Sequence, residues 1–154
     1  MEDTKPMKTS MHDSNPLRKN ESDKPVDQTI YRGMIGSLLY LTSSRLHIMH
    51  NVCLCARFHS YPQESHLKVV KRFSHYLLGT TKQCLFYKKN QDFMLVYYYD
   101  VEYAGDRVER KSTSGGCHYI GPCLISWASK KQNPIALSIA KAEYVSVATT
   151  IYNC

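Results

Sequence analysis

The sequence lacks an apolar run long enough to cross a membrane. Its longest apolar stretch, residues 34–41, is interrupted by Gly36 and Ser37, whereas a membrane-spanning helix needs roughly 20 consecutive apolar residues. The first thirty residues also lack the apolar core of a signal peptide and are too acidic for a transit peptide. We therefore expect an intracellular protein that is not secreted and has no membrane partner.

The six cysteines show no C-x-x-C pair. The chain is larger than the size class that depends on disulfides, so we interpret the cysteines as free thiols of a reducing compartment, the cytoplasm or the nucleus. Four residues of metal-binding types, His47, His50, Cys53 and Cys55, lie close together in the sequence and raise the question of a zinc site. The first three share a helical face but Cys55 points elsewhere, which argues against zinc.

Acidic residues are fewer than basic ones: the chain has 13 Asp and Glu and 20 Lys and Arg. Residues 1–29 carry five Lys and Arg against six Asp and Glu, so the net charge of +7 leaves +8 on the rest of the chain. A basic domain attracts polyanions, of which nucleic acid is the commonest.

Three helices are predicted after an irregular arm. Residues 1–26 are polar, contain three prolines and show no periodicity. A helix capped by Asp27 follows, and a second helix is expected over residues 45–60. Ser60, Pro62 and Glu64 indicate the start of a third helix, which ends at Gly79. Their apolar stripes, at helical spacing, are Ile30, Tyr31, Met34, Ile35, Leu38 and Leu39 in the first, Ile48, Val52 and Cys55 in the second, and Leu67, Val70, Ser74 and Leu77 in the third.

Extended segments follow the helices. Aromatic and β-branched residues predict antiparallel strands at 85–87, 94–99, 117–120 and 124–127, with turns at 90–92, 114–116 and 121–122. A last helix is expected over residues 138–152, with Ser138 as its N-cap and Ala140, Tyr144, Val147 and Ile151 on its apolar face.

The densest basic segment spans residues 64–89, with six positive charges against one negative. We predict a nucleic-acid-binding surface there, and the alternative is a solvated surface that keeps the protein soluble. The residues of this predicted surface are Lys68, Lys71, Arg72, Lys88 and Lys89, with Lys82 nearby.

Five strings make a family resemblance specific. They are YRGMIGSLLYLTSSR (31–45), ARFHSYPQESHLKVVKR (56–72), RKSTSGGCHYIG (110–121), ISWASKKQNPIALS (125–138) and AEYV (142–145). In this order and spacing they resemble the Pol polyprotein of copia-type retrotransposons. The resemblance implies an α+β chain, in which a helical bundle from the end of the reverse transcriptase (27–82) precedes a truncated ribonuclease H-like fold (83–154) made of an antiparallel meander and one helix.

The same resemblance implies a site for divalent cations. Ribonuclease H of this family cuts the RNA strand of an RNA–DNA hybrid with two metal ions held by about four carboxylates. Two positions match the family motif, Asp100 in YYDVEYAGD and Glu143 in AKAEYV, so Mg²⁺ is the expected cofactor. Without the resemblance, both would be read as ordinary surface carboxylates.

The family's remaining carboxylates lie beyond residue 154, so we expect a catalytically incomplete fragment of Pol. Its expected partners are an RNA–DNA hybrid or other nucleic acid and the remainder of the polyprotein. Two alternatives stay open: an active hybrid ribonuclease if the true product extends downstream, and a basic remnant that binds nucleic acid without cutting it.

Three departures from the family pattern suggest relaxed positions. Glu102 replaces an Asp, and Leu46-His47 replaces a Pro-Asp that would start the second helix cleanly. Lys141 stands where the family has a Glu, which places positive charge at the positive end of the last helix, at a cost on the order of 1 kcal/mol.

Overall fold

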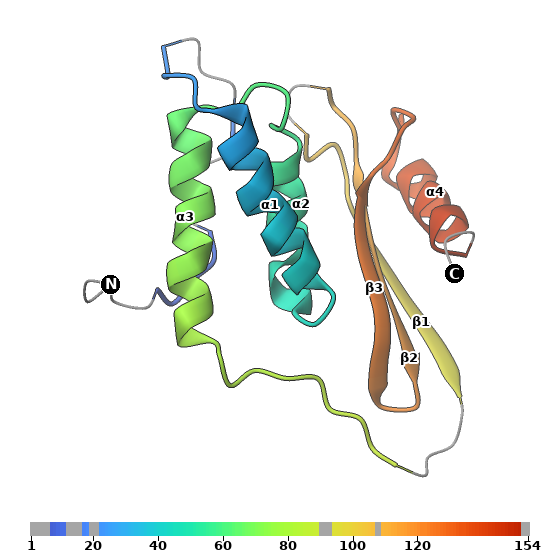
Figure 1. Ribbon diagram of the computed structural model, residues 1–154. Coiled ribbons are helices and arrows are strands. Elements are labelled where there is room, and N and C mark those ends of the chain that lie inside the picture. The colour runs from blue at the N-terminus through green and yellow to red at the C-terminus, as the bar shows by residue number, and fades with distance from the viewer. Residues whose placement is uncertain (1–6, 12–16, 19–21, 90–93, 107–108, 152–154) are drawn as a thin grey trace. The chain divides into compact units, whose positions relative to one another are not determined.

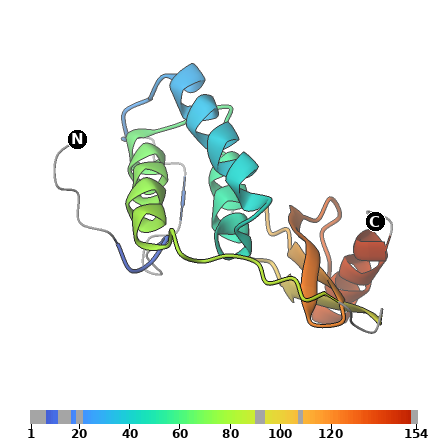
Figure 2. The same cartoon turned by 60° about the horizontal axis from the view of Figure 1, so that its bottom comes forward.

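A computed structural model describes residues 7–11, 17–18, 22–89, 94–106 and 109–151, which form two compact units, Met1–Cys84 and Leu85–Cys154 (Figures 1 and 2). The described part of the chain contains helices and an antiparallel sheet, so the predicted α+β class is confirmed. The elements are α1 (Gln28–Thr42), α2 (Leu46–Ala56), α3 (Glu64–Gly79), β1 (Leu95–Glu102), β2 (Thr113–Ile120), β3 (Cys123–Lys131) and α4 (Ile139–Ile151).

The first unit is a bundle of α1, α2 and α3 around one apolar core (Figure 1). Tyr31 is fully buried, and its hydroxyl donates a hydrogen bond to the carbonyl of Cys55, 2.9 Å away. This bond satisfies the polar end of a large buried ring and ties α1 to the end of α2. The buried apolar residues of the core are Tyr31, Ile35, Leu38, Ile48, Val52, Cys55, Val70 and Phe73.

Helix α1 begins as predicted. The carboxylate of Asp27 accepts hydrogen bonds from the backbone N–H groups of Thr29 (2.7 Å) and Ile30 (3.0 Å). This satisfies two of the donors that the first helical turn leaves unpaired. The buried stripe is narrower than predicted, because the Ile30 side chain is 59% exposed and Leu39 is also exposed.

Helix α2 starts without a side-chain cap, in agreement with the missing Pro-Asp. Arg45 is the N-cap residue and makes no capping hydrogen bond, and the first turn holds no acidic residue. The helix ends at Ala56, so the prediction that it continues to residue 60 was wrong. Residues 57–59 instead form hydrogen bonds to carbonyls three residues earlier, a tighter winding common at helix ends.

Helix α3 is rotated from its predicted orientation. His66 and Phe73 are fully buried together with Val70, whereas the predicted Ser74 is exposed and Leu77 is only partly buried. Val70 and Phe73 pack into the core that α3 shares with α1 and α2. His66 is covered from the preceding arm, where its ring contacts the carbonyl of Arg18 at 3.0 Å.

The described residues of segment 1–26 are irregular apart from one isolated bridge between Pro25 and Gln63. They lie along the first unit's own helices. The backbone N–H of Met7 donates to the carbonyl of His75 (3.2 Å), and the Asn51 amide donates to Ser10 Oγ (2.9 Å).

The second unit holds an antiparallel sheet in the order β1-β2-β3, so the predicted meander is confirmed. The β2–β3 turn lies at residues 121–122 as predicted. The predicted strand at 85–87 was wrong, because these residues form no strand. The predicted turn at 90–92 lies outside the described residues.

The predicted turn at 114–116 was also wrong, because these residues belong to β2. Gly115 pairs with Asp100 and Gly116 with Tyr99. The chain instead reverses between β1 and β2 through a loop in which Ala104 (φ 49°) and Arg110 (φ 55°) adopt left-handed backbone conformations. Neither residue is a glycine, so residue type alone does not predict these two left-handed positions, although Gly105 between them is a turn-forming residue.

Helix α4 packs against β1 and β2. Its first turn is capped as predicted, because Ser138 Oγ accepts a hydrogen bond from the backbone N–H of Lys141, at 3.3 Å. The predicted apolar face was wrong, since Tyr144 is 78% exposed while Ala142 and Ser146 are fully buried. Small residues therefore face the sheet.

Candidate metal-binding carboxylates and basic surface

Asp100 lies in β1, two residues before the strand ends at Glu102. Its side chain is exposed, and its Oδ1 accepts a hydrogen bond from the backbone N–H of Val101 at 2.8 Å. Its cross-strand partner is Gly115, which has no side chain and leaves the space beside the carboxylate open. The carboxylate is therefore accessible to a cation from solvent.

Glu143 is exposed and lies one turn into α4, as expected. Ser146, one turn further, donates a hydrogen bond from its Oγ to the backbone carbonyl of Asp100 at 3.2 Å. Helix positions three residues apart lie about 5–6 Å from each other at Cβ. The helix turn that carries Glu143 thus lies beside the strand segment that carries Asp100.

Asp100 and Glu143 are the two carboxylates that the family resemblance predicts to bind a metal ion. Among the described residues, no group of three His, Cys, Asp or Glu side chains could hold a metal ion. The chemistry of Asp100 and Glu143 suits Mg²⁺, which prefers oxygen ligands and commonly combines one or two carboxylates with water. These residues fit the partial binding of one ion and fall short of the ligand set that two ions need.

The suspected zinc residues have other surroundings. Burial raises the pKa of the Cys55 thiol to about 12, and burial likewise raises the pKa of Cys53. Because zinc binds the thiolate, these raised pKa values oppose metal binding. The ring of His47 packs edge-on against Tyr76, with centroids 5.5 Å apart.

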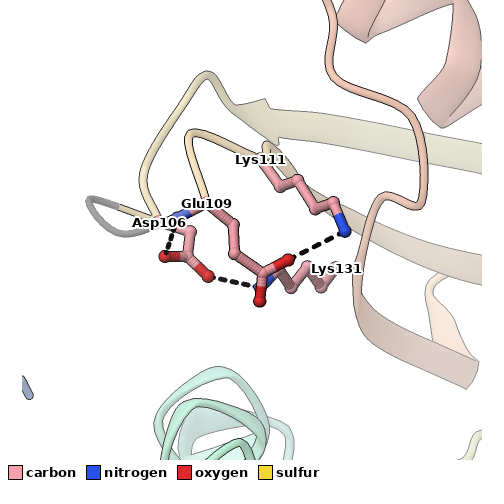
Figure 3. Close-up of polar contacts among 4 residues, drawn as sticks. All are labelled: Asp106, Glu109, Lys111 and Lys131. Carbon is pink, nitrogen blue, oxygen red and sulfur yellow. Dashed lines mark hydrogen bonds and ion pairs between the residues drawn. The ribbon is translucent and has the colours of Figure 1, made fainter. Parts of the chain in front are cut away.

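A cluster of four charged residues closes the β1–β2 loop at the end of β3 (Figure 3). Lys131 Nζ contacts Asp106 Oδ2 at 2.5 Å and Glu109 Oε1 at 2.8 Å, and Lys111 Nζ contacts Glu109 Oε2 at 2.8 Å. Asp106 Oδ1 also accepts from the backbone N–H of Glu109 at 3.1 Å. This cluster holds the loop that follows the Asp100 strand.

The pKa shifts within this cluster agree with its ion pairs. Burial alone would lower the pKa of Lys131, but its hydrogen bonds to Asp106 and Glu109 outweigh that effect and raise the pKa. Hydrogen bonds from Lys111 and Lys131 lower the pKa of Glu109. Sequence reasoning missed this cluster, because only the pairing of Thr113 with Lys131 brings the end of β3 to the loop.

The predicted nucleic-acid-binding residues are divided between the two units. Lys68 and Lys71 are exposed on α3, but Lys68 pairs with Glu64 (3.3 Å). Arg72 is half-buried, and its guanidinium donates to the carbonyl (3.2 Å) and hydroxyl (2.8 Å) of Thr9. Lys88 and Lys89 are exposed in the second unit. Whether these residues bind nucleic acid stays a prediction.

Comparison with known proteins identifies the family to which the chain belongs. The fold and the site define an α+β chain with two candidate metal-binding carboxylates. No family model and no solved structure matches the chain. It is 41% identical over 95% of its length to the retrovirus-related Pol polyprotein from transposon RE1 of Arabidopsis thaliana, and 38% identical over 95% to that from transposon RE2 of the same plant.

A third relative, the retrovirus-related Pol polyprotein from transposon TNT 1-94 of Nicotiana tabacum, is 34% identical over 97% of the chain. The chain belongs to this family of copia-type transposon Pol polyproteins, as the resemblance predicted. It spans 10% of the length of the RE1 and RE2 proteins and 12% of the TNT 1-94 protein. Within the described residues, no helix is both long and apolar enough to span a membrane.

Proposed function

We propose that the chain carries the end of the reverse transcriptase (27–82) and the first, ribonuclease H-like part (83–154) of a copia-type Pol polyprotein. In this proposal Asp100 and Glu143 are two of the carboxylates that bind Mg²⁺ for cleavage of RNA in an RNA–DNA hybrid. The observation that carries it is the hydrogen bond from Ser146 to the Asp100 carbonyl. It supports a shared site because it joins the helix turn of Glu143 to the strand of Asp100.

The roles of the residues follow from their chemistry. Bound divalent ions supply an activated water and stabilise the charge that develops on the leaving oxygen. Asp100 and Glu143 each contribute carboxylate oxygens to such an ion, and Gly115 leaves the approach to Asp100 open. Two protein carboxylates hold one ion weakly and leave a second ion without enough ligands. The 154-residue chain is therefore proposed to be a catalytically incomplete part of Pol.

A second candidate function is nucleic-acid binding without cleavage. Four of the five predicted basic residues, Lys68, Lys71, Lys88 and Lys89, are exposed. Exposed cations contribute to binding of polyanions by releasing the counterions of the phosphates. This function does not need the carboxylates, so it is separable from the first by experiment.

A cleavage assay tests the first proposal. The purified chain is expected not to cut an RNA–DNA hybrid in Mg²⁺ or Mn²⁺. Appending the downstream segment of a related Pol, with its additional carboxylates, is expected to produce cleavage, and Asp100→Asn in that extended protein is expected to abolish it. Glu64→Gln, which changes a surface carboxylate of α3, is the matched control and should cut normally. Cleavage by the unextended chain that falls with Asp100→Asn would show a working ribonuclease instead.

A further inference from the structure

Gln132, directly after β3, is a buried connector within the second unit. It is only 4% exposed, and its Nε2 donates hydrogen bonds to Ser114 Oγ (2.9 Å) and to the backbone carbonyl of Ala142 (2.8 Å). Its backbone N–H donates to the carbonyl of Ser112 at 2.9 Å. One residue thus joins β2, the end of β3 and α4.

The orientation of this carboxamide is determined by its partners. The Ala142 carbonyl can only accept a hydrogen bond, so the amide nitrogen must face it. The opposite atom, Gln132 Oε1, is buried and has no hydrogen-bond partner among the described residues. A buried acceptor without a partner is unfavourable. The two N–H bonds therefore determine the direction in which the amide is held.

A second contact acts on the same face of α4. Ala142 and Ser146 are one turn apart and both fully buried. Gln132 holds the carbonyl of Ala142 over β2, and Ser146 holds the carbonyl of Asp100 in β1. Two attachments a turn apart fix both the rotation of the helix and its position along the sheet. Glu143 immediately follows Ala142, so its backbone is held by the first attachment.

We propose that Gln132 is a positioning residue, whose carboxamide sets α4 on the sheet so that Glu143 and Asp100 can share one divalent cation. The cation rests on the function proposed above, whereas the placement of α4 does not. Gln132 acts through α4 and makes no contact with the ion. A glutamate of the same size would not replace it when ionised, because a carboxylate has no proton to donate to Ala142.

Hydrogen exchange tests the placement. Gln132→Leu removes both N–H donors and replaces the carboxamide with an apolar side chain of similar size. In this variant the backbone amides of α4 are expected to exchange roughly tenfold faster, while those of β1 and β2 keep their rates. Asn133→Leu makes a similar change at the exposed neighbouring residue and should leave α4 unchanged. Unchanged exchange in Gln132→Leu would overturn the proposal.

Gln132→Glu carries the test if the leucine variant does not fold. Its α4 amides should exchange fast at pH 8 and, after correction for the intrinsic rate, slow again near pH 5, because the protonated carboxyl regains a donor for Ala142. A residue that merely filled space would show no such recovery. Equal protection at both values of pH would therefore argue against the assigned hydrogen bond.

Mn²⁺ binding, followed by electron paramagnetic resonance, tests the positioning. The full chain should bind Mn²⁺ more tightly than Asp100→Asn, and Gln132→Leu should weaken that binding at least about fivefold, with Asn133→Leu unchanged. Faster exchange with unaltered Mn²⁺ affinity would overturn the positioning role. If the parent chain binds no better than Asp100→Asn, the proposed cation site fails, and the exchange data still decide whether Gln132 places α4.

Discussion

His66 has its protonation state defined by two backbone contacts. Its Nδ1 lies 3.2 Å from the backbone N–H of Gln63, which can only donate, so Nδ1 must be the unprotonated acceptor. Its Nε2 lies 3.0 Å from the carbonyl of Arg18, which can only accept, so Nε2 must carry the proton. The ring packs on Phe58, with centroids 4.0 Å apart. The first unit is therefore built around a neutral His66.

Acidification is expected to destabilise the first unit. Burial lowers the pKa of His66 below its ordinary value of 6.5, although the Arg18 carbonyl and Asp23 oppose the shift. Because the unfolded chain then binds the proton more readily, the stabilisation is present above about pH 6.5 and is lost as the pH falls toward the lowered pKa. Burial lowers the pKa of His47 and His59 too, so their effect has the same sign.

The measurement is the free energy of unfolding in urea between pH 7.5 and 5. His66→Gln should remove part of its decline on acidification. A His66→Gln variant with the parent's full dependence on pH would show that another group is responsible.

At the scale of the element, features that depend on a few neighbouring residues were predictable. Asp27 and Ser138 cap their helices, and the turn at 121–122 lies where Gly121 and Pro122 place it. The orientations of α3 and α4 were not predictable from periodicity. Each depends on a partner remote in sequence: Arg18 contacts the buried side of α3, and Asp100 accepts the bond from α4.

The residues of the candidate site also divide into those that the sequence could predict and those that it could not. Asp100 and Glu143 could be named from the strings that contain them. Gln132 and Lys131 could not, because their roles arise only when β2 and β3 pair and bring them to Ser114 and Asp106. A string resemblance identifies side chains that a ligand would contact, whereas residues that hold those side chains in place require the register of the sheet.

The observed orientation of α3 makes a distinct prediction about stability. Phe73 is fully buried and Leu78, in the same helix, is 57% exposed. Phe73→Ala should lower the free energy of unfolding by about 3–4 kcal/mol, because it removes a large buried ring and leaves a cavity. Leu78→Ala should change it by less than about 0.5 kcal/mol. Denaturant unfolding of both variants measures the difference, and equal losses would contradict the described orientation.

On the scale of the whole molecule, the basic residues predicted to bind nucleic acid are not all equally accessible to phosphate groups. Arg72 is engaged by Thr9 of the arm, and Lys68 is paired with Glu64. Lys71, Lys88 and Lys89 are exposed, the first on α3 and the others in the second unit. These three are the best candidates for contact with phosphates, so a binding experiment should change them and leave Arg72 in place.

Reversal of these three charges should weaken binding to an RNA–DNA hybrid and reduce its dependence on salt. In Lys71→Glu/Lys88→Glu/Lys89→Glu, the slope of log binding constant against log salt concentration should become shallower by roughly three, because each lost phosphate contact removes about one released counterion. The matched control, Lys8→Glu/Lys24→Glu/Lys130→Glu, alters the net charge by the same amount at exposed positions elsewhere. Fluorescence anisotropy titrations at several salt concentrations give both slopes. An unchanged slope in the first variant, or an equal loss in the control, would show that these three lysines do not form a localised nucleic-acid surface.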